Sequence, residues 1–178
     1  MRGSLRFASA LALCLVLGTG AALARAIETA RIQNPTPGAA TVLRDGVVTP
    51  VTASTEFKAG DQITVESGAK MTVSFEDGSS VTLVGPSTMT FLDLSDSGRR
   101  VRLDSGVITE AKALGIALEV QTPYAESLVL QNSSAFARVV PGDKVTFQRL
   151  EGDYAKVWTP DGGFQNLGDA AYTVNVRG

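Results

Sequence analysis

Histidine is absent from this sequence, and its single cysteine, Cys14, lies in an N-terminal apolar run. Without histidine, neither a Ser-His nor a Cys-His nucleophile arrangement can be built. If residues 1–26 are removed, no cysteine remains, so no disulfide can form and no zinc or copper site of the usual nitrogen and sulfur type is available. We therefore expect a protein without a cofactor or a metal, and not an enzyme.

A convincing amphipathic helix and a basic stripe are also missing. Without residues 1–26 the chain keeps 13 of its 16 basic residues and all 18 acidic ones, which gives a net charge of −5. An acidic chain without a basic stripe is a poor match for nucleic acid. The 152 residues that remain suit one domain with a workable core.

The first 26 residues have the features of a secretory signal peptide. Arg2 and Arg6 precede an apolar run over residues 7–17, and small residues follow up to Ala26. We predict cleavage after Ala26; the alternative is an uncleaved N-terminal anchor. Export without disulfides is typical of a bacterial periplasm or surface, so we expect a periplasmic or secreted bacterial protein that does not span the membrane after cleavage.

After the signal peptide, residues 27–40 contain Pro35, Pro37 and Gly38 and are predicted to form a flexible leader. Residues 41–178 are predicted to form one β domain. Its clearest stretch, residues 60–83, has three apolar runs separated by turn residues, with Asp77-Gly78 as a hairpin turn. Asp45-Gly46 predicts an earlier hairpin of the same kind.

A second stretch, residues 142–167, has a related pattern. Gly60-Asp61 matches Gly142-Asp143, and Asp77-Gly78 matches Asp161-Gly162 after a two-residue insertion. Two interpretations stay open: two related β units, or two ordinary hairpins that share turn chemistry.

Short strands rich in valine and threonine, separated by glycine and aspartate turns, continue to the end of the chain. We expect turns at Gly85-Pro86 and at residues 104–106, and a loop or single helical turn over residues 110–118. The pattern predicts an all-β fold, as a solenoid-like or sandwich-like stack of short strands and hairpins.

The chain resembles the FecR domain family. Residues 59–91 are similar to that family's sequence of a Gly-Asp turn, a strand, Asp-Gly, a strand and a Gly-Pro-Ser turn, and residues 101–108 and 120–123 continue the likeness. One departure is Asn132-Ser133-Ser134, where the family often has Gly-Thr. The resemblance implies a β-solenoid-like stack with a binding or scaffold role in the envelope.

FecR itself has a cytoplasmic segment that holds a sigma factor and a membrane span, and we find neither here, so we do not transfer its role in relaying a signal. We expect a non-enzymatic envelope protein with a protein–protein interaction, scaffold or regulatory binding role. The alternative function is a module that binds cell-envelope glycan, peptidoglycan above all.

The sequence offers a few candidate sites with ordinary explanations beside them. Glu151 with Asp153, or Asp61 with Asp77, could form a catalytic carboxylate pair, although turn chemistry explains these residues as well. Asp93, Asp96 and Gly98 could hold calcium, or form a solvated hairpin tip. A third candidate is a basic cluster that could bind phosphate or protect a sheet edge: Arg99, Arg100 and Arg102.

The strongest ligand-binding candidates are Tyr154 and Trp158. They share one parity with Lys156 in a predicted strand, opposite Ala155 and Val157. On an exposed face the two rings could stack on a sugar; on a core face Trp158 would simply be buried.

Overall fold

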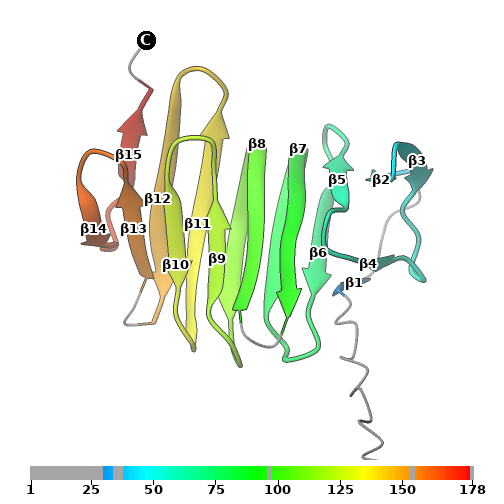
Figure 1. The fold of residues 1–178 in the computed structure, drawn as a ribbon, viewed down its shortest axis with the longest axis horizontal. Coiled ribbons are helices and arrows are strands. Elements are labelled where there is room, and N and C mark those ends of the chain that lie inside the picture. The colour runs from blue at the N-terminus through cyan, green and yellow to red at the C-terminus, as the bar shows by residue number, and fades with distance from the viewer. Residues whose placement is uncertain (1–29, 34–37, 96–97, 153–154, 177–178) are drawn as a thin grey trace, which may run out of the picture.

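The computed structural model describes residues 30–33, 38–95, 98–152 and 155–176 (Figure 1). These residues form 15 strands and no helix, and therefore no helix that could cross a membrane. The strands belong to one connected, mostly antiparallel sheet that does not close on itself. The all-β prediction is confirmed.

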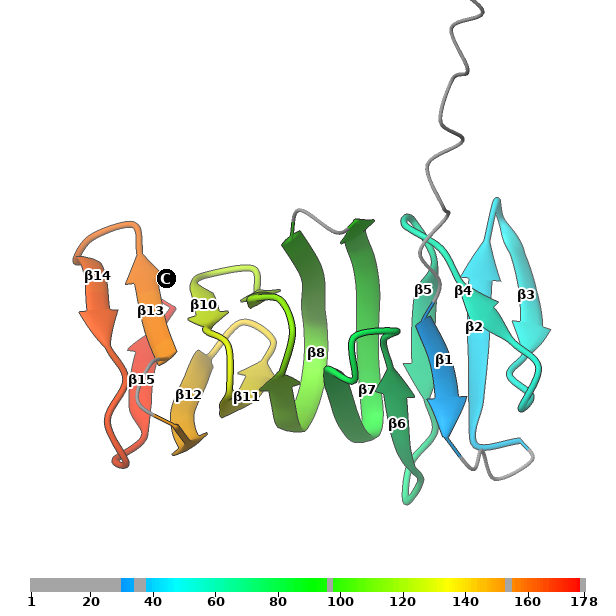
Figure 2. The same cartoon turned by 90° about the horizontal axis from the view of Figure 1, so that it is seen from below.

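Two long strands, β7 (Ser80–Ser95) and β8 (Gly98–Ala113), form the centre of the fold. The first half of β7 pairs with β6, and its second half pairs with β5. Likewise, the first half of β8 pairs with β9 and its second half with β11. Both strands curve between two layers, as Figure 2 shows.

The predicted turns at Gly85-Pro86 and residues 104–106 are wrong, because both positions are bends inside these strands. A Cβ on Gly85 would lie 1.8 Å from the carbonyl oxygen of Glu66, and Gly106 has a φ of +95°. Glycine is therefore required at both bends by close approach or by backbone conformation. Residues 110–113, predicted as loop or helical turn, are also strand.

Layer A is one of the two arrays of strands that share β7 and β8. Its order is β14-β13-β10-β9-β8-β7-β5-β2-β3. All neighbours are antiparallel except β8 and β9. The additional strands are β2 (Ala40–Arg44), β3 (Val47–Pro50), β5 (Gln62–Val65), β9 (Leu118–Gln121), β10 (Glu126–Val129), β13 (Ala155–Thr159) and β14 (Gly163–Asn166).

Layer B also extends from β7 and β8 in both directions. Its order is β4-β1-β6-β7-β8-β11-β12-β15, and all its pairs are antiparallel. The additional strands are β1 (Ala30–Gln33), β4 (Glu56–Phe57), β6 (Lys70–Ser74), β11 (Ser133–Val140), β12 (Lys144–Glu151) and β15 (Tyr172–Asn175). Residues 30–33 lie within the predicted flexible leader, so that prediction does not hold for them.

The hydrophobic core lies between the two layers. Buried and less buried residues alternate along β5, β9 and β13, as expected for strands with one face on a core. Phe57 from layer B stacks on Phe91 from layer A, with ring centroids 4.8 Å apart. The fold is thus sandwich-like; the strands form an open sheet and not a solenoid, because antiparallel hairpins replace stacked parallel coils.

The Asp-Gly hairpins form as predicted. Asp45 and Gly46 both have positive φ, and Arg44 pairs directly with Val47 across the two-residue turn. The two similar stretches have the same arrangement, one strand followed by a hairpin in the other layer. In the first stretch β5 lies in layer A and the β6–β7 hairpin in layer B. In the second stretch β12 lies in layer B and the β13–β14 hairpin in layer A. Gly68 and Gly152, which correspond in the two stretches, have φ of 79° and 80°.

Candidate functional site

Trp158 lies on the outer face of layer A, away from the core. Its neighbours Val157 and Thr159 are buried, whereas Trp158 itself is half-buried, with the same orientation as Lys156. The alternation predicted for this strand is correct, and the core-face interpretation of Trp158 is wrong. Tyr154 lies outside the described residues, so the Tyr154–Trp158 platform stays a prediction.

A different aromatic residue accompanies Trp158. Phe164 of β14 pairs directly with Trp158 and is 68% exposed. Phe164 belongs to the same stretch, residues 142–167, but no sequence pattern indicates a role for it. Only the register of the β13–β14 hairpin brings the two rings to one face.

Two carboxylates lie beside these rings. Glu126 of β10 pairs directly with Trp158, and a small cavity of about 80 Å³ is lined by Glu119, Glu126, Ser127, Leu128 and Phe164. Burial raises the pKa of the Glu126 carboxyl, and the nearby negative charge of Glu119 raises it further, against a smaller opposing effect of Arg100. Nothing local in the sequence signals Glu126, because its contact with Trp158 joins strands far apart in the chain.

Direct pairing continues across layer A as one row of outward-facing residues, which we call the outer row. Its middle part is polar, and its two ends are apolar or aromatic. From β3 to β14 the outer row consists of Val48, Leu43, Gln62, Thr90, Arg102, Gln121, Glu126, Trp158 and Phe164.

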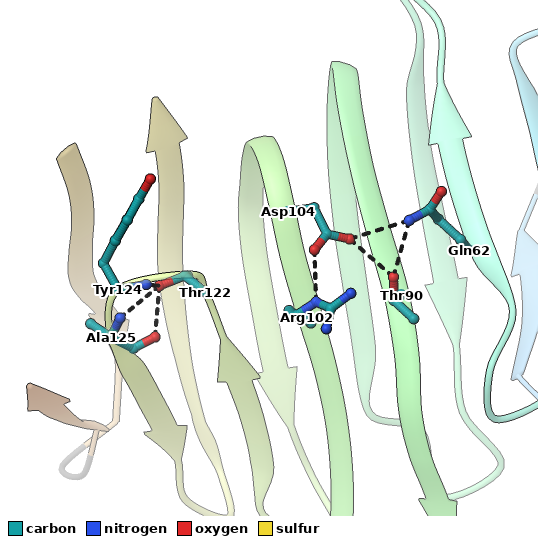
Figure 3. A network of polar contacts seen from close by, with 7 residues as sticks. All are labelled: Gln62, Thr90, Arg102, Asp104, Thr122, Tyr124 and Ala125. Atoms are coloured by element: carbon teal, nitrogen blue, oxygen red, sulfur yellow. Dashed lines mark hydrogen bonds and ion pairs between the residues drawn. The ribbon is translucent and has the colours of Figure 1, made fainter. Parts of the chain in front are cut away.

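A polar network fixes the middle of the outer row (Figure 3). The Asp104 carboxylate accepts hydrogen bonds from Arg102 Nε at 2.7 Å, Thr90 Oγ1 at 3.0 Å and Gln62 Nε2 at 3.4 Å. These contacts join three strands and hold the Arg102 guanidinium in place. Of the predicted basic cluster, Arg102 is thus paired with Asp104, and Arg100 lies 3.5 Å from Asp93.

Arg99, the third member of that cluster, is an interior residue. Its side chain is 2% exposed, forms an ion pair with Asp77 and lies 5.0 Å from the centroid of the Phe75 ring. Arg99 is therefore part of the core between the layers and not of a phosphate-binding surface. Since each arginine has a carboxylate partner, the three do not form a basic patch.

The carboxylates proposed as catalytic pairs have structural partners. Asp61 accepts hydrogen bonds from Arg44 Nε at 2.8 Å, Arg44 Nη2 at 2.5 Å and the Lys58 amide at 2.8 Å. Burial raises the pKa of Asp61, but these hydrogen bonds and the charge of Arg44 outweigh it and leave the pKa lowered. Such a carboxylate stays ionised and is a poor general acid.

The same holds for Asp77, which accepts hydrogen bonds from Ser79 and from the Ile116 amide in addition to Arg99. Burial raises the pKa of Asp77, and its bonds to Ser79 and Arg99 more than compensate, so the pKa is lowered. Of the remaining candidate residues, Asp153 and Asp96 lie outside the described residues. No group of histidine, cysteine or acidic residues that could hold a metal occurs in the part of the chain that the structure describes.

A larger cleft, which no sequence pattern indicated, opens where layers A and B end near β14 and β15. Its volume is about 550 Å³. The cleft lies between the turn after β9, which Figure 3 shows, the turn after β13, and strand β15. Its lining residues are Pro123, Tyr124, Thr159, Pro160, Asp161, Gly162, Tyr172, Val174, Asn175 and Val176.

Hydrogen bonds define one wall of this cleft. The Thr122 hydroxyl accepts from the Ala125 amide at 3.0 Å and donates to the Ala125 carbonyl at 2.6 Å, which closes a tight turn. The turn presents Tyr124, whose hydroxyl accepts from the Gly142 amide at 3.3 Å. On the opposite wall, Tyr172 and Val174 pack against the core while remaining partly exposed.

Comparison with known proteins connects this fold to one family. The family model described as FecR protein matches residues 61–153. Two crystal structures of a candidate anti-sigma factor from Parabacteroides distasonis ATCC 8503, at 1.65 and 2.50 Å resolution, are similar at 19% identity and a TM-score of 0.41. Each match covers 61% of this chain and 60% of the other. No curated protein matches. Because the family model matches more than half of the chain, the protein belongs to the FecR protein family.

Proposed function

We propose that this protein is a non-enzymatic, regulatory binding domain of the bacterial envelope that recognises an extended segment of another protein. The observation that carries the proposal is the cleft beside β15. Among the described residues β15 pairs only with β12, so one edge of β15 lines the cleft with unpaired backbone groups. An extended peptide added to such an edge gains main-chain hydrogen bonds and places alternate side chains inward.

The opposite end of layer B supports the same reasoning. There the short strand β4 occupies the edge, and Phe57 is fully buried against Phe91. At the β15 end no described strand has this position, and Tyr172 and Val174 remain partly exposed. A partner segment with a large apolar side chain would bury them as Phe57 buries Phe91.

Membership in the FecR family supports a regulatory, non-enzymatic role. We propose a location in the periplasm or outside the cell, because the sequence of residues 1–26 has the features of a secretory signal peptide.

The test is site-specific photo-crosslinking in intact cells. A benzophenone amino acid at Asn175, on the cleft, is expected to crosslink one envelope protein through a single extended stretch of its sequence. Val174→Lys is expected to abolish this product, and the same probe at Lys70, on β6, is not expected to form it. Equal products at both probe positions, or none at Asn175, would contradict the proposal.

A second candidate function is glycan binding at Trp158 and Phe164. The observation that favours it is the outward pair of rings with Gln121 and Glu126 in the same row, since sugars bind to aromatic faces flanked by polar groups. Trp158 is the only tryptophan, so its fluorescence reports on this face alone. Protection of Trp158 from acrylamide by peptidoglycan, lost in Phe164→Ala, would support this candidate; quenching indifferent to peptidoglycan would exclude it.

A further inference from the structure

Large apolar side chains are exposed mainly at the two edges of layer A. Of five such residues in the described part of the chain, four lie on β2, β3 and β14: Leu43 (37% exposed), Val47 (61%), Val48 (61%) and Phe164 (68%). The two edges lie at opposite ends of the long axis of the molecule (Figure 1). The fifth residue, Leu150 of β12, lies in layer B.

Both edge strands lack the charged side chains that often prevent an edge from pairing with another chain. Neither β3 (sequence VVTP) nor β14 (sequence GFQN) carries a charged residue. All four residues of each strand are exposed, including those that face inward, so layer B covers neither strand. Among the residues that the structure describes, each strand pairs with one neighbour only, which leaves its other edge without a partner strand there.

The direction of the two strands makes them complementary. Seven of the eight neighbouring pairs in layer A are antiparallel and one is parallel. The chain direction therefore reverses an odd number of times between β3 and β14. If two copies keep their outer faces on the same side, β14 of one copy runs antiparallel to β3 of the other.

The side chains agree with this pairing. Val48 and Phe164 are the two ends of the outer row, so an antiparallel junction in register places them opposite each other. A β-branched residue opposite an aromatic one is a favourable cross-strand pair. The junction would also join Leu43 and Trp158 into a continuous apolar row of four residues. Pro50, which has no amide hydrogen, would fall beyond the end of β14.

From these four features we propose that copies of this protein associate head to tail, with β3 of one copy paired antiparallel to β14 of the next. Such a contact is heterologous, so it leaves one free β3 edge and one free β14 edge at the ends of every assembly. The protein then forms open chains that grow with concentration. This proposal is independent of the cleft beside β15.

Complementary edge variants test the arrangement by sedimentation velocity. Wild-type protein is expected to form species larger than dimers as its concentration rises. Val48→Lys alone and Phe164→Lys alone are both expected to remain monomeric, whereas an equimolar mixture is expected to form a 1:1 dimer that grows no further. Leu150→Lys, which alters the exposed apolar residue away from the edges, is the matched control and should associate like wild type.

The other outcomes overturn the proposal. A monomeric wild type would exclude association, and a mixture that stays monomeric would exclude a heterologous junction. If Val48→Lys or Phe164→Lys still associates without the other variant, the unaltered edge strand pairs with the same strand of a second copy. Because all three positions are exposed, circular dichroism should show folding like wild type in each variant.

A disulfide measures the register directly. In a chain with Cys14→Ser, mixing Val48→Cys and Phe164→Cys proteins under oxidising conditions is expected to give a covalent heterodimer. Val47→Cys, whose side chain faces inward, should not crosslink to the Phe164→Cys protein. Equal crosslinking by both valine positions would contradict the proposed pairing.

Discussion

Buried carboxylates in this protein are bound by arginines from other strands. Asp61 follows the turn at Gly60, and Arg44 reaches it from the end of β2 with two hydrogen bonds. Gly142-Asp143 lies at the corresponding place in the second stretch, but its carboxylate is not buried. The Asp143 side chain is 59% exposed, and its Oδ2 lies 3.5 Å from Nζ of Lys144. The same sequence pattern therefore produces a structural ion pair in one place and a solvated turn in the other.

This difference gives a matched pair of variants. Asp61→Ala should lower the free energy of unfolding by about 2 kcal/mol, because it leaves Arg44, Lys58 and the turn without their acceptor. Asp143→Ala should change it by less than about 0.5 kcal/mol. Urea unfolding at neutral pH measures both, and equal effects would show that the Asp61 ion pair has no special role.

The pH dependence of the Asp61 effect follows from its lowered pKa. A carboxyl whose pKa is lower in the folded than in the unfolded protein contributes stability above its unfolded pKa. That contribution is lost as the pH falls through the folded pKa. The difference between wild type and Asp61→Ala should therefore shrink in acid, and a constant difference would contradict this.

Glu126 should behave in the opposite way. Its pKa is raised by burial and by Glu119, so its ionised form is unfavourable in the folded protein. The favourable contribution of the protonated carboxyl is present at low pH and is lost as the pH rises through the folded pKa. Glu126→Gln should thus raise the melting temperature at neutral pH but not in acid. Glu151→Gln, at an exposed position, should have little effect at either pH.

At the scale of elements, the bend in β7 carries one chain segment through both layers. Gly85→Ala should destabilise the protein severely, by about 3 kcal/mol or more, because its Cβ would overlap the Glu66 carbonyl. Gly98→Ala is the matched control, since no atom lies within 4 Å of its added Cβ. Thermal melts of the two variants compare them, and equal stability would mean that β7 can move away from Glu66.

The individual strands and hairpins were predictable from the sequence, because each depends on local alternation and on turn residues such as Asp45-Gly46. The bends at Gly85 and Gly106 were not, since a glycine required by close packing between strands has the same sequence signature as a glycine in a turn. Strand β1 was missed for a related reason. It is four residues long and belongs to the sheet only through pairing with β4 and β6.

The candidate sites were predictable only in part. Alternation within one strand placed Trp158 opposite Val157, but only the structure shows which of the two faces points outward. Its neighbours Glu126 and Phe164 depend on the pairing of strands. The cleft beside β15 had no local signal at all, because three separate segments line it. Non-local arrangement is what single-sequence patterns do not encode.

For the whole molecule, one core between two layers should unfold as a unit. Phe57→Ala, at one end, should lower stability by about 3–5 kcal/mol because it leaves a cavity beside Phe91. The fluorescence of Trp158, at the other end, should report the same midpoint as circular dichroism. If the unfolding midpoint measured by Trp158 fluorescence in Phe57→Ala stays at the wild-type value, the two ends unfold separately.

The family match covers the centre of this architecture. Residues 61–153 run from the start of β5 to the end of β12 and include both curved strands, whereas β1–β4 and β13–β15 lie outside. Both ends of the molecule, with the exposed edges and the cleft, are largely built from segments outside the matched part. A common centre with replaceable ends would let relatives diverge in what they bind while inheriting the same core, and chimeras that exchange these end segments should fold and exchange partners together.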